Sequence, residues 1–362
     1  MAKQLTLNKS KMNEITIVNK KIGLNHPPFI IAEMSGNHNQ SLEKALAIID
    51  AAHKAGVHAL KLQTYTADTI TIDVKSDNFL ISDPDSLWKG QTLYELYQQA
   101  YTPWEWHKPI FERCRELGLL AFSTPFDETA VDLLEDLNVP VYKIASFENN
   151  HLPLLKKVAS TGKPIIISTG MASIADLDLA ISTIRDSGCN DIILLKCAST
   201  YPATPEDINL LTIPHMKQLF DAEVGLSDHT LGVGVSIGSV ALGATVIEKH
   251  FTLNRMDGGV DSAFSMEPDE MKILVEETFK SWQALGKVHY GVTEKEKSSI
   301  RFKRSIFVVE DIRKGEEFTD KNIRIIRPGY GLLPRHYEIL LRKKATCDVK
   351  RGTPMRWELV NT

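Results

Sequence analysis

EVGLSDHT (residues 223–230) and TVIEKHFT (residues 245–252) are short apolar runs that end in polar residues with a histidine, His229 in the first and His250 in the second. The two histidines are 21 residues apart, and a helix-like segment fills the gap. This spacing is typical of consecutive strands of a β/α barrel, in which the C-terminal ends of the strands form the catalytic rim. Two imidazoles at adjacent rim positions are suited to bind one divalent metal ion.

Six similar runs precede this pair, and most are followed by a helical pattern. They are FIIAEMS (29–35), ALKLQTY (59–65), LLAFSTPF (119–126), VYKIASFE (141–148), PIIISTGM (164–171) and DIILLKCAS (191–199). Eight alternating β and α units favour an α/β fold of the TIM (β/α)8 barrel type over an open sheet. A doubly wound sheet remains the alternative, although the GxGxxG turn is absent after the first strand.

Two of the expected helices carry clear end signals. Ser41 is placed to cap the helix that follows it, and Gly56 is placed to end that helix. Ser173 opens another helix with Asp176 at capping-box spacing, and Gly188 is its predicted stop. Local signals therefore support the alternation of strands and helices.

The pattern changes along the chain at two places. Residues 66–104 are too long for a plain connection between a strand and a helix, so this segment is expected to form part of the rim. After residue 286 a charged stretch is followed by short strand candidates and a Gly-containing turn. The sequence predicts a barrel over 1–286, a linker over 287–304 and a small β-rich domain over 305–362.

Composition limits the class of protein. Hydrophobic residues make up 43% and charged residues 24%, as in an ordinary globular domain, and the net charge of -4 favours neither nucleic acid nor an acidic membrane as a partner. Four scattered cysteines without CxxC spacing indicate free thiols in the cytoplasm. The first 17 residues lack the apolar core of a signal peptide, and no apolar run reaches membrane-spanning length.

Polar residues at the predicted strand ends form a coherent chemical set. Lysines supply positive charge and hydroxyls supply hydrogen bonds, which suits a phosphate and carboxylate ligand. The residues of this kind are Lys61, Lys143, Ser146, Ser168 and Ser227, and Gln63 and Thr124 also stand at strand ends. Capping of the next helix is the competing explanation for each serine.

The acidic residues and histidines suggest the chemistry. His229 and His250 suit a metal such as Mn²⁺ or Mg²⁺ with open positions for water or substrate. A single histidine near a strand end is more often structural, so the prediction depends on the pair. Glu33, Glu148 and Asp261 could orient substrate hydroxyls or assist proton transfer.

Seven motifs occur in an order that resembles the sialic acid synthase family, also called the N-acetylneuraminate synthases. They are IAEMSGNHNQS, ALKLQTY, FSTPFD, YKIASFENN, ISTGMAS, GLSDHTLG and IEKHFTL. SIFVVEDIRKGEEFTDKNIRIIRPGYG (305–331) resembles the antifreeze-like, or SAF, domain at the C-terminus of that family. The resemblance covers almost the entire chain.

The resemblance implies a transferase that condenses phosphoenolpyruvate with an amino-sugar aldehyde, giving a nine-carbon ulosonic acid and phosphate. It implies that His229 and His250 bind a divalent metal, Mn²⁺, Mg²⁺ or Co²⁺. The residues matching groups that hold phosphoenolpyruvate are Lys61, Lys143, Ser146, Ser168 and Ser227. Those matching the sugar site or the reacting centre are Glu33, Thr124, Glu148, Tyr201 and Asp261. Arg327 matches an arginine that the small domain delivers to a neighbouring subunit, which implies a domain-swapped homodimer.

Two departures from the family pattern bear on the acceptor sugar. Acetylneuraminate synthases usually read AEIGxNHxG in the first motif and GPDH in the late loop, whereas this chain has AEMSGNHNQ and GGVDSAFS. Both variants resemble the pseudaminic acid synthase branch, whose acceptor is 2,4-diacetamido-2,4,6-trideoxy-altropyranose. Ser199 also stands where sialic acid enzymes often have asparagine. Synthases of N-acetylneuraminate, legionaminic acid or 3-deoxy-ulosonate phosphates, and a non-catalytic carbohydrate-binding barrel, remain alternatives.

Overall fold

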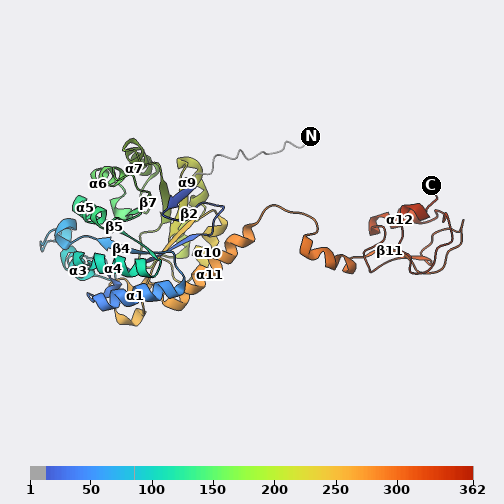
Figure 1. The fold of residues 1–362 in the computed structure, drawn as a ribbon, viewed down its shortest axis with the longest axis horizontal. Helices are drawn as coiled ribbons and strands as arrows, with labels where there is room; N and C mark the ends of the chain where they lie inside the picture. The colour runs from blue at the N-terminus through green and yellow to red at the C-terminus, as the bar shows by residue number, and fades with distance from the viewer. Residues whose placement is uncertain (1–13, 85, 362) are drawn as a thin grey trace. The chain divides into compact units, whose positions relative to one another are not determined.

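The computed structural model describes residues 14–84 and 86–361, and the chain divides after Gly286 into two compact units. Figure 1 shows the first as a barrel surrounded by helices and the second as a small unit with little regular structure. The prediction about a signal peptide falls largely outside the described residues.

Eight parallel strands close the barrel of the first unit. They are β3 (Phe29–Glu33), β4 (Ala59–Thr64), β5 (Leu120–Pro125), β6 (Tyr142–Ile144), β7 (Ile165–Ser168), β8 (Ile192–Cys197), β9 (Glu223–Ser227) and β10 (Val246–His250). Each lies within one of the eight predicted runs. The barrel closes between β10 and β3, where Val246 pairs with Phe29 and His250 with Glu33. The predicted barrel is therefore confirmed, and the doubly wound alternative is wrong.

Helices follow the strands around the outside (Figure 1). They are α1 (Leu42–Ala55), α2 (Ala67–Ile70), α3 (Leu93–Ala100), α4 (Trp104–Glu116), α5 (Glu128–Asp136), α6 (Leu152–Ala159), α7 (Ile174–Asp186), α8 (Pro205–Ile208), α9 (Thr212–Phe220), α10 (Gly234–Ala241) and α11 (Pro268–Leu285). The Ser41 hydroxyl accepts from the Lys44 amide, and Gly56 ends α1 with a φ of 85°. Ser173 and Asp176 form the predicted capping box, and α7 ends at Asp186, two residues before Gly188.

Short 3-10 helices lie in several connections that leave the strand ends. They are η1 (Ser35–His38), η2 (Asp77–Phe79), η3 (Ser146–Glu148), η4 (Arg255–Asp257) and η5 (Ser262–Phe264). The long segment 66–104 reaches the loop after β10, because the Trp88 indole donates to the Val260 carbonyl at 3.1 Å. Its predicted place at the rim is confirmed. A hairpin of β1 (Ile15–Ile17) and β2 (Lys20–Ile22), which the sequence did not indicate, precedes the barrel.

Close packing of β9 against β10 requires glycine at position 225. A Cβ there would lie 2.2 Å from the Val246 carbonyl oxygen and 2.7 Å from Leu195 Cδ2. We expect Gly225→Ala to destabilise the barrel by about 2–4 kcal/mol, because neither the backbone nor the packed leucine can move freely. Urea unfolding followed by circular dichroism measures this loss.

Gly234 provides the control for that substitution. It is the first residue of α10, and a Cβ there would have no atom of the described residues within 4 Å. Gly234→Ala should be neutral or stabilise by up to about 1 kcal/mol. Equal unfolding midpoints for the two variants would contradict the packing argument.

The second unit has its own small core. Strands β11 (Ser305–Val308) and β12 (Ile323–Ile326) pair antiparallel, with η7 (Pro334–His336), α12 (Tyr337–Leu340) and η8 (Trp357–Leu359) after them. Ile306, Phe318 and Met355 are fully buried in this core. Within the predicted linker the structure has a 3-10 helix, η6 (Glu294–Phe302), opened by a capping box of Thr293 and Glu296. This capping box was not predicted from the sequence, because the charged residues around it are typical of a linker.

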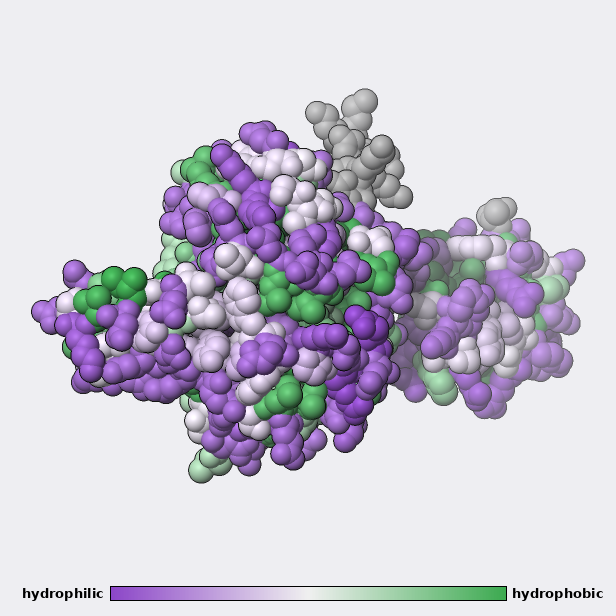
Figure 2. All heavy atoms as spheres, turned by 60° about the vertical axis from the view of Figure 1, so that its left-hand side comes forward, coloured by the Kyte–Doolittle hydropathy of each residue, from purple (hydrophilic) through white to green (hydrophobic). Residues whose placement is uncertain are grey.

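The surface is mainly hydrophilic on the face in Figure 2, where hydrophobic side chains gather only in small separate groups. Among the described residues, none of the helices combines the length and the apolar character needed to span a bilayer.

Candidate active site

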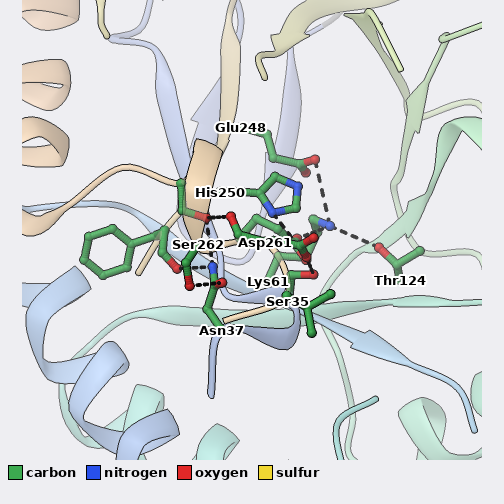
Figure 3. A network of polar contacts seen from close by, with 12 residues as sticks. Ser35, Asn37, Lys61, Thr124, Glu248, His250, Asp261 and Ser262 are labelled. Atoms are coloured by element: carbon green, nitrogen blue, oxygen red, sulfur yellow. Dashed lines mark hydrogen bonds and ion pairs between the residues drawn. The ribbon is translucent and has the colours of Figure 1, made fainter. Parts of the chain in front are cut away.

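Buried polar side chains converge inside the C-terminal end of the barrel (Figure 3). Lys61 lies at the centre, forming an ion pair with Glu33, a hydrogen bond to Thr124 Oγ1 at 3.2 Å and a longer contact of 3.8 Å with Glu248. The Lys143 ammonium lies 3.0 Å from the same Glu248 oxygen. Glu33, Lys61, Lys143 and Glu248 therefore form one group of alternating charge, here called the lysine–glutamate cluster.

Burial controls the protonation of this cluster. Removal from water raises the pKa of Glu33 to about 7, against the opposing effect of Lys61 and with a contribution from the Glu248 carboxylate. Burial also lowers the pKa of Lys143, whereas for Lys61 the two carboxylates outweigh burial and raise the pKa. A carboxyl group that titrates near neutral pH is suited to take up or release a proton during a reaction.

A second group of hydroxyls lies beside β7. Ser146 Oγ accepts from the Gly170 amide at 3.2 Å. Within the described part of the chain, the buried hydroxyls of Ser168 and Ser199 have no hydrogen-bond partner. A Cβ at Gly170 would lie 2.2 Å from Ser199 Oγ and 2.6 Å from Ser146 Oγ, so the absence of a side chain keeps this space open. Unsatisfied buried hydroxyls are costly unless a ligand completes their bonds.

The two histidines stand next to each other, as the strand order requires. His229 Nδ1 lies 2.9 Å from the Ala198 carbonyl oxygen, and such a bond fixes the tautomer and leaves Nε2 free as a ligand. His250 Nδ1 is buried without a hydrogen-bond partner among the residues described. Burial lowers the pKa of His250 well below its usual range, which favours the neutral imidazole that metals bind.

The spacing of the rings fits joint coordination. The ring centroids of His229 and His250 are 5.3 Å apart. Imidazole nitrogens bind zinc at about 2.0–2.1 Å, so two rings at this separation can reach one ion. Across residues 14–84 and 86–361, no group of three or more His, Cys, Asp or Glu side chains is arranged to hold a metal ion. In this part of the chain the two histidines are therefore the candidate nitrogen ligands, and water or substrate would have to complete any coordination.

Aromatic rings enclose the histidine pair. The Tyr201 ring centroid is 4.6 Å from that of His229, and the Phe264 centroid is 4.9 Å from that of His250. Tyr201 and Phe264 lie 5.3 Å apart, and Trp88 lies 5.9 Å from Tyr201. Sequence reasoning missed Phe264, whose only signal was its place three residues after Asp261.

The loop after β10 lies against the turn after β3 (Figure 3). Asp261 Oδ2 is 3.9 Å from His250 Nδ1 and accepts a hydrogen bond from Ser35. Burial raises the pKa of Asp261, while the bond from Ser35 opposes the rise. Asn37 donates to the Phe251 carbonyl at 3.0 Å. The structure therefore joins the two motifs that depart from the family pattern.

The remaining predicted residues lie as follows. Ser227 Oγ donates to Glu248 at 3.1 Å, which adds it to the cluster. Gln63 is half-buried on β4, and Arg327 is exposed in the second unit just after β12. Asp228, next to His229 in the sequence, forms a buried ion pair with Lys249 at 3.0 Å.

Glu148 follows β6 and is half-buried, with one carboxylate oxygen lacking a partner among the described residues. Burial raises its pKa to about 7, and Lys143 opposes this. Since the folded state binds this proton more tightly than the unfolded state, the contribution to stability is complete below about pH 4.5 and is lost as pH rises through 7.

Replacing Glu148 by glutamine should remove this pH dependence. Relative to the wild type, Glu148→Gln is expected to gain about 1–3 kcal/mol in the free energy of unfolding between pH 5 and pH 8. Urea titrations at both pH values measure the change, with the exposed Glu112→Gln on α4 as the control. If the difference in free energy of unfolding between Glu148→Gln and the wild type is the same at pH 5 and pH 8, the raised pKa of Glu148 is contradicted.

Comparison with known proteins gives a consistent result. Residues 48–290 match the NeuB family and residues 303–361 match the SAF domain. The chain is 46% identical to a pseudaminic acid synthase of Helicobacter pylori over 91% of its length and 96% of that protein. It is 43% identical to one of Campylobacter jejuni, covering 91% and 95% of the two chains. An N-acetylneuraminic acid synthetase from Leptospira borgpetersenii, solved with citrate, superposes with a TM-score of 0.71 at 33% identity, covering 80% of this chain and 96% of that one.

Proposed function

Because the chain belongs to the NeuB family and carries a SAF domain, we propose that it is a transferase that makes pseudaminic acid. Its substrates are phosphoenolpyruvate and 2,4-diacetamido-2,4,6-trideoxy-altropyranose, and its products are pseudaminic acid and phosphate. The observation that carries this proposal is identity of 43–46% with pseudaminic acid synthases over 91% of the chain. Residues 1–286 form the catalytic domain, 287–304 the linker and 305–362 the SAF domain.

Phosphoenolpyruvate lies between the lysine–glutamate cluster and the hydroxyl groups of Ser146 and Ser168. Lys61 and Lys143 supply positive charge in a region shielded from water, where attraction to an anion is strong. Ser146 and Ser168 donate hydrogen bonds to its oxygens, with Ser227 placing Glu248 between the lysines. The unpartnered hydroxyls support this assignment, since a phosphate or carboxylate would complete their bonding.

The residues at the rim centre fit a divalent metal such as Mn²⁺, Mg²⁺ or Co²⁺. His229 and His250 hold it, as the 5.3 Å ring spacing and the unpartnered His250 Nδ1 support. When bound, such an ion supplies Lewis acidity toward the aldehyde oxygen of the open-chain sugar. Tyr201 closes one side of this space and limits the access of water.

The acidic residues move the protons of the reaction. Carbon 3 of phosphoenolpyruvate bonds to the aldehyde carbon, water adds to carbon 2, and the carbon 2–oxygen bond to phosphate breaks. Water gives up its two protons in this sequence, one of which ends on the former aldehyde oxygen and the other on the released phosphate, and Glu33, Glu148 and Asp261 carry them. The raised pKa values of Glu33 and Glu148, both about 7, support this role. Thr124 and Gln63 orient the sugar or the reacting groups from β4 and β5.

The active form is a domain-swapped homodimer in the cytoplasm. Exposed apolar side chains at the rim support a cover by another chain: Phe147, Met171, Leu231 and Met256 are 57%, 67%, 61% and 89% exposed in the loops after β6, β7, β9 and β10. Arg327 reaches the neighbouring site in this assembly. The four free cysteines fit a reducing compartment.

Phosphate release from phosphoenolpyruvate with Mn²⁺ tests the proposal. We expect turnover with the altrose acceptor and none above background with N-acetylmannosamine. Turnover with N-acetylmannosamine instead would assign the chain to N-acetylneuraminate synthesis. Sugar binding without phosphate release from any acceptor would support the non-catalytic alternative.

A further inference from the structure

Ser35 adopts a backbone conformation that serine seldom takes. Its φ is 48°, in the left-handed region that favours glycine, and its side chain is buried. Such a conformation persists in a folded protein when surrounding contacts hold it in place, and it often marks a functional position. The turn is also crowded at the next residue, because a Cβ at Gly36 would lie 3.1 Å from the Ala100 backbone.

The Ser35 side chain makes a contact that explains this conformation. Its hydroxyl donates to Asp261 Oδ2, the oxygen that lies 3.9 Å from His250 Nδ1 (Figure 3). Ser35 follows β3 and Asp261 follows β10, the two strands that close the barrel. The bond therefore spans the closure of the barrel and ends beside the histidine pair.

Other contacts hold the main chain around Asp261 rather than its carboxylate. Asn37 Nδ2 donates to Ser265 Oγ at 2.8 Å, and Ser265 Oγ donates to the Asp261 carbonyl at 2.7 Å. Ser262 Oγ donates to Asn37 Oδ1 at 3.3 Å. The Asp261 carboxylate itself is held by a hydrogen bond from the Ser35 hydroxyl and by one from the Gly36 amide.

We propose that Ser35 is a positioning residue, whose left-handed backbone aims its hydroxyl at Asp261 and so fixes that carboxylate beside His250. This inference rests on the proposed function, in which Asp261 acts on water or on the acceptor. Ser35 is not one of the serines beside β7 that are proposed to bind phosphoenolpyruvate. Loss of the Ser35 hydroxyl should therefore affect turnover rather than the binding of phosphoenolpyruvate.

Two substitutions separate positioning from stability. Ser35→Ala removes the hydroxyl and keeps the unfavourable backbone, whereas Ser35→Gly removes both. We expect both variants to lose about tenfold or more in kcat, with the KM for phosphoenolpyruvate within about twofold of the wild type. Ser35→Gly should unfold about 1–3 °C above Ser35→Ala, because glycine is relaxed at this φ.

Asn138 supplies the matched control. Its φ is 54°, it is exposed, and it follows α5 in the loop that enters β6 at the opposite end of the barrel. Asn138→Gly should keep the wild-type kcat while relieving the same kind of backbone conformation. Wild-type kcat in both Ser35 variants, or activity that follows the melting temperature from one to the other, would overturn the inference. Absence of phosphate release from the wild type would instead overturn the proposed function.

Discussion

Replacing His229 by alanine is expected to lower phosphate release by about 10³-fold or more while the barrel stays folded. The side chain is one of the two imidazoles that lie next to each other at the rim, and its Nδ1 contact with Ala198 leaves Nε2 free as the proposed metal ligand. In the proposed site, losing one of the two protein ligands should remove most of the affinity for the ion. Turnover with Mn²⁺ and direct Mn²⁺ binding by calorimetry measure the two effects.

The exposed His53 on α1 is the control, and His53→Ala should match the wild type in turnover and in metal binding. Near-normal turnover of His229→Ala after treatment with a chelator would refute the metal assignment. Wild-type metal affinity combined with lost turnover would show that the histidine acts on the substrate instead.

Replacing Lys143 by methionine is expected to reduce kcat/KM for phosphoenolpyruvate by about 10²–10³-fold, mainly through KM. Methionine fills similar space but brings no charge to a site where 2% of the lysine side chain is exposed. Glu248 keeps Ser227 and the more distant Lys61 as partners, so the fold should lose only about 1–3 kcal/mol. Steady-state kinetics and urea unfolding of the same variant separate the two effects.

Lys217 provides the matched control at the other end of β9. Its ammonium lies 2.7 Å from Glu223, a buried carboxylate at the start of that strand. Lys217→Met should lose a half-buried ion pair without any change in the KM for phosphoenolpyruvate. An equal change in KM for both variants would mean that the effect of Lys143 comes from the fold rather than from substrate binding.

Much of the barrel could be predicted because its signals are local. An apolar run of five to eight residues identifies a buried parallel strand, and Ser41 or Ser173 caps a helix through atoms three residues away. The same holds for the histidines, since a residue at the end of a strand reaches the rim of any closed parallel barrel. The failures were also local: the capping box of η6 was hidden by its charge, and the short β1–β2 hairpin had little pattern to detect.

The partners within the site could not be predicted in the same way. Nothing near Glu248 in the sequence indicates that it lies between Lys61 and Lys143, because these contacts join residues more than 100 positions apart. The grouping of Phe264 with His250 depends on how the loop after β10 folds back. Such contacts depend on strand order and on the direction of each side chain, which only a closed barrel fixes.

The eight strands, their helices and the residue types at each strand end follow from local sequence, because alternation and capping act over a few residues. Which of those residues meet depends on how the barrel folds. Closure between β10 and β3 brings Ser35 to Asp261 across 226 positions of the chain, and the exclusion of water there raises the pKa of Glu33 to about 7. Burial and distance, which set the chemistry of these groups, are properties of the folded chain rather than of any segment of it.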